Sequence, residues 1–236
     1  MNTSNKFFFA AVLLMTVSCK KESNNIHSGS LINTDMKSVS ATDVAAAKYT
    51  AVLIGTQKWM TANLNVNRYR NGDRIPQVKD PIKWKTLTTG AWCWYNNDSA
   101  NYAVTYGKLY NWYAVHDARG LAPNGWHIPA YDEIVVLYNL LGGYQLAGGP
   151  LKETGTVHWA APNVAATNST GFTALPGGYQ LASGSFTGIN TLGLWWSASE
   201  NSSSSAWDFY IYNNYGTFSI SPGVKQAGLS VRCIKD

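Results

Sequence analysis

The sequence predicts an α+β domain in which two main helices accompany many short antiparallel strands. The 236 residues include ten Trp, fourteen Tyr and twenty-one Gly, a composition typical of strands joined by tight turns. Short apolar or alternating runs are separated by glycine- and asparagine-rich segments. Two longer segments instead repeat apolar residues at helical spacing. The length fits one domain preceded by a tail.

The first 18 residues have the pattern of a bacterial export signal. Lys6 precedes an apolar run, residues 7–15, which suits a signal-peptide core but is too short to span a bilayer. The run ends in Thr16-Val17-Ser18-Cys19, which resembles the lipobox of bacterial lipoproteins. We therefore expect residues 1–18 to be removed and Cys19 to be acylated, with palmitate-like chains that anchor the protein to a lipid bilayer. An ordinary secretory signal with a coincidental cysteine is the alternative.

Residues 19–48 are predicted to be a flexible linker. They are rich in Ser, Thr and Ala, contain no aromatic residue and show no apolar periodicity. The composition changes at Tyr49, so the folded domain is expected to span residues 49–236. An acylated chain of this kind is expected at the cell outer membrane. The sequence does not distinguish attachment to its periplasmic face from attachment to its extracellular face.

The first half of the domain contains both predicted helices. Strand-like runs lie at residues 50–54, around 58–60 and at 91–95. Residues 107–116 place an aromatic stripe at helical spacing, with Gly120 as a stop signal. The second helix is expected after Pro129, with acidic residues in its first turn and two glycines after Leu141.

The second half is predicted to consist of strands and glycine turns. The expected strands lie at residues 171–175, 194–197, 207–212 and 217–221. Asn213-Asn214-Tyr215-Gly216 is expected to be the turn of a hairpin between the last two strands.

Cysteine use suggests a disulfide bond. If Cys19 carries lipid, Cys93 and Cys233 are the two remaining cysteines of an exported protein, each in a strand-like context. We expect them to pair and to tie the C-terminal strand to the early part of the domain. Two separate buried thiols are the alternative.

The charge pattern argues against a nucleic-acid partner. Residues 58–85 carry seven basic residues and two acidic ones, whereas residues 86–236 carry six basic and eight acidic residues. Nucleic-acid binders usually present a broader basic face. We interpret residues 58–85 as a solvated basic loop, and contact with phosphate or an acidic glycan is the alternative.

The sequence lacks the patterns of common catalytic sites. No Gly-x-Ser-x-Gly, His-Glu-x-x-His or Gly-x-x-x-x-Gly-Lys occurs, and no two histidines of the domain have i,i+4 spacing. Two of the carboxylates Asp132, Glu133, Glu200 and Asp208 could serve as the catalytic pair of a glycosidase, which is an alternative that the sequence leaves open. Asp132 and Glu133 also fit the first turn of a helix. We predict a protein that is not an enzyme and that uses no cofactor or metal.

Aromatic, amide and carboxylate side chains gather late in the chain. The candidate ligand-binding residues are Trp195, Trp196, Glu200, Trp207, Asp208, Asn213 and Asn214. Aromatic rings offer a sugar a flat apolar surface, while amides and carboxylates bind its hydroxyl groups. We therefore expect carbohydrate binding here. Packing of the three tryptophans in the core is the alternative.

Several motifs in order resemble one family. They are Gly55-Thr56-Gln57-Lys58-Trp59-Met60-Thr61-Ala62-Asn63-Leu64-Asn65-Val66, Tyr106-Gly107-Lys108-Leu109-Tyr110-Asn111-Trp112-Tyr113-Ala114-Val115, Gly125-Trp126-His127-Ile128-Pro129, Gly171-Phe172-Thr173-Ala174-Leu175-Pro176-Gly177-Gly178-Tyr179, Trp195-Trp196-Ser197-Ala198-Ser199-Glu200 and Ser230-Val231-Arg232-Cys233. Together they resemble the Fibrobacter succinogenes major paralogous domain over residues 49–236. The resemblance implies an exported protein or lipoprotein of the Bacteroidetes and Fibrobacter type.

A more distant resemblance concerns the fold. Residues 125–129 with Asp132 and Glu133 are similar to a segment of the formylglycine-generating sulfatase modifiers, which implies a C-type-lectin-like fold. The related oxidase needs a late pair of reactive cysteines to hold copper, whereas only Cys233 is late here. Trp207-Asp208 lacks the Asn of a calcium-lectin Trp-Asn-Asp motif, so calcium dependence is not expected.

These observations predict an exported lipoprotein that displays a non-catalytic binding domain. A glycan or a cell-surface protein is the expected ligand. A structural or assembly component of a surface complex is the alternative, and a degenerate formylglycine-generating-type enzyme is a weaker one.

Overall fold

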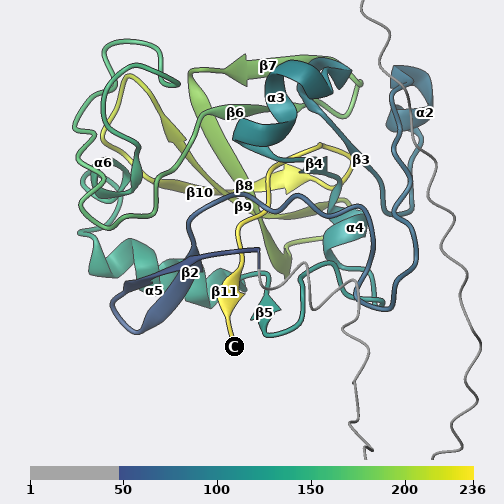
Figure 1. The fold of residues 1–236 in the computed structure, drawn as a ribbon, viewed down its shortest axis with the longest axis horizontal. Coiled ribbons are helices and arrows are strands. Elements are labelled where there is room, and N and C mark those ends of the chain that lie inside the picture. Colours follow the sequence, from purple (N-terminus) through teal and green to yellow (C-terminus); the bar gives the residue numbers. More distant parts are fainter. Residues whose placement is uncertain (1–47) are drawn as a thin grey trace, which may run out of the picture. The chain divides into compact units, whose positions relative to one another are not determined.

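The computed structural model describes residues 48–236, which form an α+β domain of several small antiparallel sheets and short helices (Figure 1). The predicted signal peptide, the acylation site Cys19 and all but the last residue of the predicted linker lie outside the described residues. Within the described part of the chain, no helix combines the length and apolar character needed to cross a membrane.

The helices are short and lie mainly in the first half of the domain. They are α2 (Pro81–Lys85), the 3₁₀ helix η1 (Tyr95–Asn97), α3 (Ser99–Tyr106), α4 (Trp112–Val115), α5 (Tyr131–Leu140) and α6 (Gly148–Leu151). The strands are β1 (Ala51–Ile54), β2 (Gln57–Met60), β3 (Trp92–Cys93), β4 (Leu109–Tyr110), β5 (Trp126–His127), β6 (Gly177–Gln180), β7 (Phe186–Ile189), β8 (Leu192–Glu200), β9 (Ser205–Tyr212), β10 (Ser219–Val224) and β11 (Ile234–Lys235).

One sheet joins the beginning and the end of the domain. Its strand order is β1-β2-β11-β5, and Ile234 of β11 lies opposite both Trp59 of β2 and His127 of β5. The predicted strands at residues 50–54 and 58–60 are confirmed as the β1–β2 hairpin. The C-terminal strand therefore closes the domain against its first hairpin (Figure 1).

A second sheet, with the order β10-β9-β8, runs through the centre of the domain (Figure 1). It confirms the strands predicted at residues 194–197 and 207–212, and the β9–β10 pairing confirms the predicted hairpin. Because side chains alternate along a strand, Trp195 and Phe209 face one buried cluster while Trp196 faces another. Both faces of this sheet are therefore covered.

The prediction after Pro129 is confirmed by α5. Oε2 of Glu133 accepts a hydrogen bond from the backbone N–H of Ala130 at 2.9 Å, which satisfies one unpaired donor at the helix start. Ile134 and Leu137 are buried on the helix face that packs beside β8. The amphipathic pattern therefore located this helix correctly.

The prediction of a helix over residues 107–116 is wrong for most of its length. Leu109 and Tyr110 form β4, which pairs with β3, and α4 begins only after Asn111. The Asn111 side chain accepts a hydrogen bond from the N–H of Ala114 at 3.1 Å and so caps this single turn. The aromatic residues at helical spacing belong to a strand, β4, followed by a single helical turn, α4. The helix α3 was not predicted.

The strand predicted at residues 171–175 does not form either. Thr173 has a φ of +53°, and its N–H donates to the Asn168 side chain at 2.9 Å. This left-handed conformation interrupts an extended backbone. Phe172 is nevertheless buried, and Ala174 makes a single bridge to Lys152.

The disulfide prediction is wrong in this structure, because Cys93 and Cys233 are both free and buried. Cys93 packs with Trp84 and Leu109, and its thiol lies 2.9 Å from Oε1 of Gln180. Cys233 packs in a different cluster of buried side chains. Burial raises the pKa of both thiols. The alternative of two separate buried thiols is the one that the structure adopts.

A buried polar network connects distant parts of the chain. The guanidinium of Arg232 donates to Oδ1 of Asn63 from Nε at 3.1 Å and from Nη2 at 2.8 Å, and to the carbonyls of Met60 and Phe172. The indole N–H of Trp195 donates to the same Asn63 oxygen at 2.8 Å. The charge of Arg232 is thus solvated by neutral oxygens inside the domain.

Candidate functional site

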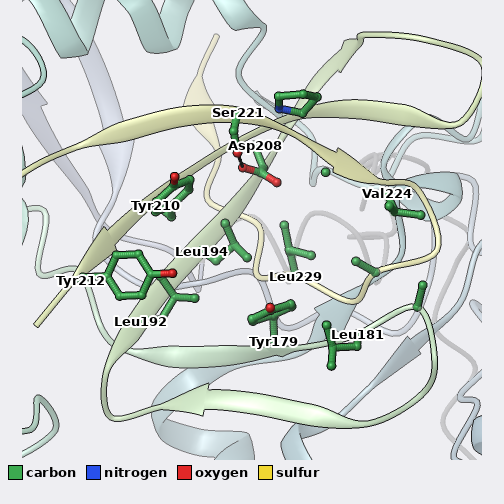
Figure 2. Close-up of a pocket in the computed structure, with 14 residues that line it drawn as sticks. Tyr179, Leu181, Leu192, Leu194, Asp208, Tyr210, Tyr212, Ser221, Val224 and Leu229 are labelled. Carbon is green, nitrogen blue, oxygen red and sulfur yellow. Dashed lines mark hydrogen bonds between the residues drawn. The ribbon is translucent and has the colours of Figure 1, made fainter.

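A cavity of about 420 Å³, called the tyrosine pocket below, lies beside the central sheet. It lies between one face of the β8–β9–β10 sheet and the segments around β6 and residues 227–229 (Figure 2). Its lining residues are Tyr179, Leu181, Ala182, Leu192, Leu194, Asp208, Tyr210, Tyr212, Ser221, Pro222, Gly223, Val224, Ala227 and Leu229. This volume is in the range of small-molecule sites.

Strand alternation places the pocket residues on one face of the sheet. Asp208, Tyr210 and Tyr212 occupy every second position of β9 and line the pocket together (Figure 2). Leu194 of β8 lies opposite Tyr210, and Ser221 of β10 lies opposite Asp208. The sheet therefore supplies a row of polar and aromatic groups beside an apolar surface.

The surrounding backbone holds both walls of the pocket in place. Nζ of the buried Lys152 donates to the carbonyls of Tyr212 at 3.1 Å and Tyr215 at 2.9 Å, just where β9 ends. Across the pocket, Gln180 of β6 exchanges two backbone hydrogen bonds with Gly228. These bonds fix the segments that carry Tyr212 and Tyr179.

Asp208 is the only charged residue in the lining. Its side chain is nine-tenths buried, and Oδ1 accepts a hydrogen bond from the Ser221 hydroxyl at 3.0 Å (Figure 2). Among the described residues, no donor lies within hydrogen-bonding reach of Oδ2. Burial raises the pKa of this carboxyl to about 7, against the smaller lowering effect of the Ser221 hydrogen bond.

Gly223 makes room for this carboxylate. A Cβ atom at this position would lie 2.3 Å from Oδ2 of Asp208 and 3.2 Å from the Trp196 ring. Any larger residue would therefore displace the carboxylate or the strand beneath it. The glycine keeps Oδ2 open to the pocket.

Asp208→Asn is expected to stabilise the domain by about 4 kcal/mol near pH 8. Because the pKa of Asp208 is raised on folding, the folded wild-type protein binds a proton at this carboxyl more tightly than the unfolded chain does. The contribution of Asp208 to stability is therefore greatest below pH 3.8, the pKa of this carboxyl in the unfolded chain. That stability falls as the pH rises through about 7, where the folded carboxyl ionises. The amide side chain in Asp208→Asn has nearly the same shape but does not ionise, so the variant does not lose stability in this pH range. Urea unfolding of both proteins across this pH range measures the difference, and parallel pH profiles would contradict it.

The tyrosines give the pocket aromatic walls. Tyr210 and Tyr212 contact each other edge to face, with ring centroids 5.6 Å apart at 81°. Tyr212 is 39% exposed and lies at the rim, whereas Tyr179 faces the sheet from the opposite wall (Figure 2). Such rings can pack against the apolar face of a ligand while their hydroxyl groups hydrogen-bond its polar edge.

A second cavity lies between α5 and β10. It has a volume of about 440 Å³, and its lining includes Tyr131, Tyr138, Tyr144 and Phe218. No charged side chain contributes to this lining. The cavity therefore offers apolar contact but lacks the buried ionisable group that distinguishes the tyrosine pocket.

The tryptophans predicted as ligand contacts do not line the pocket. Trp195 and Trp196 are wholly buried on opposite faces of β8, and the indole N–H of Trp196 donates to the Tyr110 carbonyl at 2.8 Å. Trp207 is partly buried against Tyr131, with ring centroids 4.6 Å apart, on the β9 face opposite Asp208. Core packing, the alternative interpretation, holds for Trp195 and Trp196.

The other candidates lie at opposite ends of β9. Glu200 is exposed and pairs with Lys225 beside the loop that precedes β9. Asn213 follows β9, and its amide donates to the carbonyls of Ala160 at 3.2 Å and Ala161 at 3.1 Å. Asn214 is exposed in the turn beyond it. Of the seven predicted residues, only Asp208 therefore lines the tyrosine pocket.

Sequence reasoning missed Tyr179, Tyr210, Tyr212 and Ser221. The available signal was the period-two pattern of β9, which puts Asp208, Tyr210 and Tyr212 on one face. Grouping residues by proximity in the sequence instead combined side chains from both faces. Tyr179 and Ser221 carry no local signal, because only the fold brings them to Asp208.

The histidines are engaged in local contacts. His127 lies between two carboxylates, with Nε2 2.9 Å from Glu133 and Nδ1 2.7 Å from Asp236. Burial lowers the pKa of His127, but these two hydrogen-bonded carboxylates outweigh that effect and raise it. His158 lies 2.8 Å from Glu153. Within residues 48–236, no cluster of three or more acidic, histidine or cysteine side chains has the arrangement of a metal site.

A family model for the Fibrobacter succinogenes major domain matches residues 52–235. The chain belongs to this family. No curated protein and no solved structure matches the chain. In this Fibrobacter succinogenes major domain, Trp59, Asn63, Trp195 and Arg232 of the motifs that resemble the family are buried. Thr56, Lys58 and Glu200 of the same motifs are exposed. Most of the residues that line the pocket lie outside these motifs.

Proposed function

We propose that this protein is an outer-membrane-anchored lipoprotein whose domain binds glycans, without catalysis, in the tyrosine pocket. The observation that carries the proposal is the combination of three tyrosines, the Ser221 hydroxyl and the Asp208 carboxyl around one cavity of about 420 Å³. Sugars offer both the apolar faces and the hydroxyl groups that such a surface recognises. The resemblance of residues 16–19 to a lipobox supports membrane attachment of this domain.

The number of carboxyl groups favours binding over glycoside hydrolysis. Asp208 is the one carboxyl group in the lining of the pocket, whereas most glycosidases use two carboxyl groups on either side of the bond that they cleave. A single buried carboxyl with one free oxygen is suited to hydrogen-bond or pair with a ligand. This supports a recognition role for the pocket.

Replacing Tyr212 is expected to weaken glycan binding. Tyr212→Ala removes an aromatic wall at the rim of the pocket, and we expect an affinity loss of about tenfold, or roughly 1.4 kcal/mol. Tyr215→Ala is the matched control, because Tyr215 is 55% exposed nearby and does not line the pocket. A glycan array followed by titration calorimetry, with the full-length chain in detergent, measures the effect. Absence of binding to any glycan, or equal losses in both variants, would contradict the proposal.

Anchoring can be tested independently of ligand binding. In cells fed labelled palmitate, we expect the wild-type chain to incorporate label and to fractionate with the outer membrane. Cys19→Ala is expected to abolish both properties, since it removes the only thiol at the proposed cleavage point. Cys93→Ala is the control and should keep the label. Label in the Cys19 variant, or an unlabelled and soluble wild-type protein, would overturn the anchoring proposal.

We also propose that the α+β architecture is of the C-type-lectin-like kind. The pairing of β11 with β2, which brings the end of the domain beside its first hairpin, supports this assignment. The position of α5 beside the central β8 also supports it. Superposition of a crystal structure of this protein on C-type-lectin domains tests the proposal, and a different strand connectivity would contradict it.

A further inference from the structure

We propose that the ligand of the tyrosine pocket carries a protonated amine, which pairs with the free Oδ2 of Asp208 while its carbon skeleton packs against the tyrosine rings. This inference rests on the proposed function and narrows its ligand class. Within glycans, it points to units with an unacetylated amino group. Probes that differ in charge, with and without a sugar ring, distinguish recognition of the amine from recognition of the sugar.

The first argument is the missing counter-charge of Asp208. Buried charges are usually paired or fully hydrogen-bonded, because leaving water costs several kcal/mol per ion. The other large buried charges of this domain follow that rule, since Arg232 and Lys152 each donate to several oxygens of the chain itself. Asp208 has one hydrogen bond, from Ser221. A cationic ligand would supply the partner that the chain does not.

No basic side chain of the domain is available for this role. The residues that line the pocket include no Lys, Arg or His. Lys225, which follows the lining residue Val224, instead pairs with Glu200 and lies over the Trp112 ring, with Nζ 4.7 Å from the ring centroid. The pocket therefore has a site for negative charge and no cation of its own.

The second argument is the aromatic surroundings of the carboxylate. An ammonium group is attracted to the face of an aromatic ring, and the interaction strengthens when water is excluded. Tyr179, Tyr210 and Tyr212 supply such rings on two sides of the pocket (Figure 2). Leu194 and Leu229 add apolar surface for the carbon atoms next to the amine. An amine on a saturated ring matches this combination.

The ionisation of Asp208 should couple to binding. The other titratable groups that line the pocket are the hydroxyls of Tyr179, Tyr210 and Tyr212, and burial raises the pKa of Tyr212 above its ordinary value. A bound ammonium group favours the ionised carboxylate, so it should lower the pKa of Asp208 from about 7. Affinity for an amine should accordingly rise from about pH 5.5 to about pH 7, until the amine itself loses its proton.

The test compares two pairs of probes that differ in charge. One pair is the β-1,4-linked trimer of glucosamine and the corresponding trimer of N-acetylglucosamine. The other pair is cyclohexylammonium and cyclohexanol, which have similar shapes but no sugar character. Calorimetry with the full-length chain gives the affinities. The carboxyl carbon resonance of Asp208 reports its apparent pKa in the wild-type protein, so this readout does not depend on a variant.

We expect the amine trimer to bind at least about tenfold more tightly than the N-acetyl trimer near pH 7. Cyclohexylammonium, but not cyclohexanol, should lower the apparent pKa of Asp208. Asp208→Asn should remove the tenfold preference for the amine trimer over the N-acetyl trimer. Ser221→Ala, which keeps the carboxylate, should retain the preference.

The outcomes distinguish this inference from the glycan proposal. Equal affinity for both trimers, with no effect of cyclohexylammonium on Asp208, would overturn the amine inference and leave glycan binding intact. A response of Asp208 to cyclohexylammonium without binding of either trimer would support the amine inference and contradict the glycan function. If none of the four probes binds and none changes the apparent pKa of Asp208, the amine inference is overturned.

Discussion

Asn63→Leu is expected to lower the free energy of unfolding by about 3–5 kcal/mol. Oδ1 of Asn63 accepts hydrogen bonds from two guanidinium nitrogens of Arg232 and from the Trp195 indole. Its amide donates to the Tyr106 carbonyl at 2.9 Å. Leucine has a similar size but satisfies none of these groups, so a buried cation loses its main acceptor. Urea unfolding monitored by tryptophan fluorescence measures the loss.

Asn214→Leu is the control for this substitution. Asn214 is exposed in the turn after β9, and its replacement should change stability by no more than about 0.5 kcal/mol. A loss below about 1 kcal/mol for Asn63→Leu would show that other groups solvate Arg232. In that case the network would not be what holds the β2, β8 and C-terminal segments together.

Trp196→Ala is expected to destabilise the domain by about 3–5 kcal/mol. The Trp196 ring is wholly buried in the cluster that includes Tyr110 and Trp112, and its indole N–H donates to the Tyr110 carbonyl. The substitution leaves a large cavity and removes one of the two hydrogen bonds that the Tyr110 carbonyl accepts, while the bond from the Leu229 N–H stays. Chemical unfolding gives the size of the loss, and a small loss would show that the neighbouring side chains collapse into the space.

Trp207→Ala is the matched control on the neighbouring strand. Trp207 is only partly buried against Tyr131, so its removal should cost clearly less than the removal of Trp196. This contrast bears on the choice of binding variants. Loss of ligand binding in Trp196→Ala would follow from unfolding, whereas Tyr212 and Asp208 can be changed at the pocket itself.

Local patterns located the strongest elements of the domain. The helix α5 was predicted because its apolar residues recur at helical spacing. The strands β8 and β9 were predicted as short runs rich in apolar and aromatic residues between turn-forming segments. The segment at residues 107–116 was misassigned because its aromatic spacing is shared between β4 and α4. Pairing of β4 with β3 is a long-range interaction and decided that segment.

The candidate site was predicted only in part. Residue types such as Trp, Asn and Asp predicted a binding region near β8 and β9, and Asp208 does line a pocket there. Trp196 and Trp207 were included because they are close in the sequence. Whether a side chain enters the core or a cavity depends on which face of a sheet it occupies and on what covers that face.

The sequence by itself determined the family, the α+β class and the position of the strongest elements, because ordered motifs and periodic burial are written along the chain. Only the tertiary structure decided that Cys93 and Cys233 stay apart, that Trp195 and Trp196 are core residues, and that Tyr179 meets Asp208 across a pocket. These outcomes depend on contacts between residues far apart in the chain. Local propensity contains no information about which such contacts form, because their free energy arises when separate elements pack together.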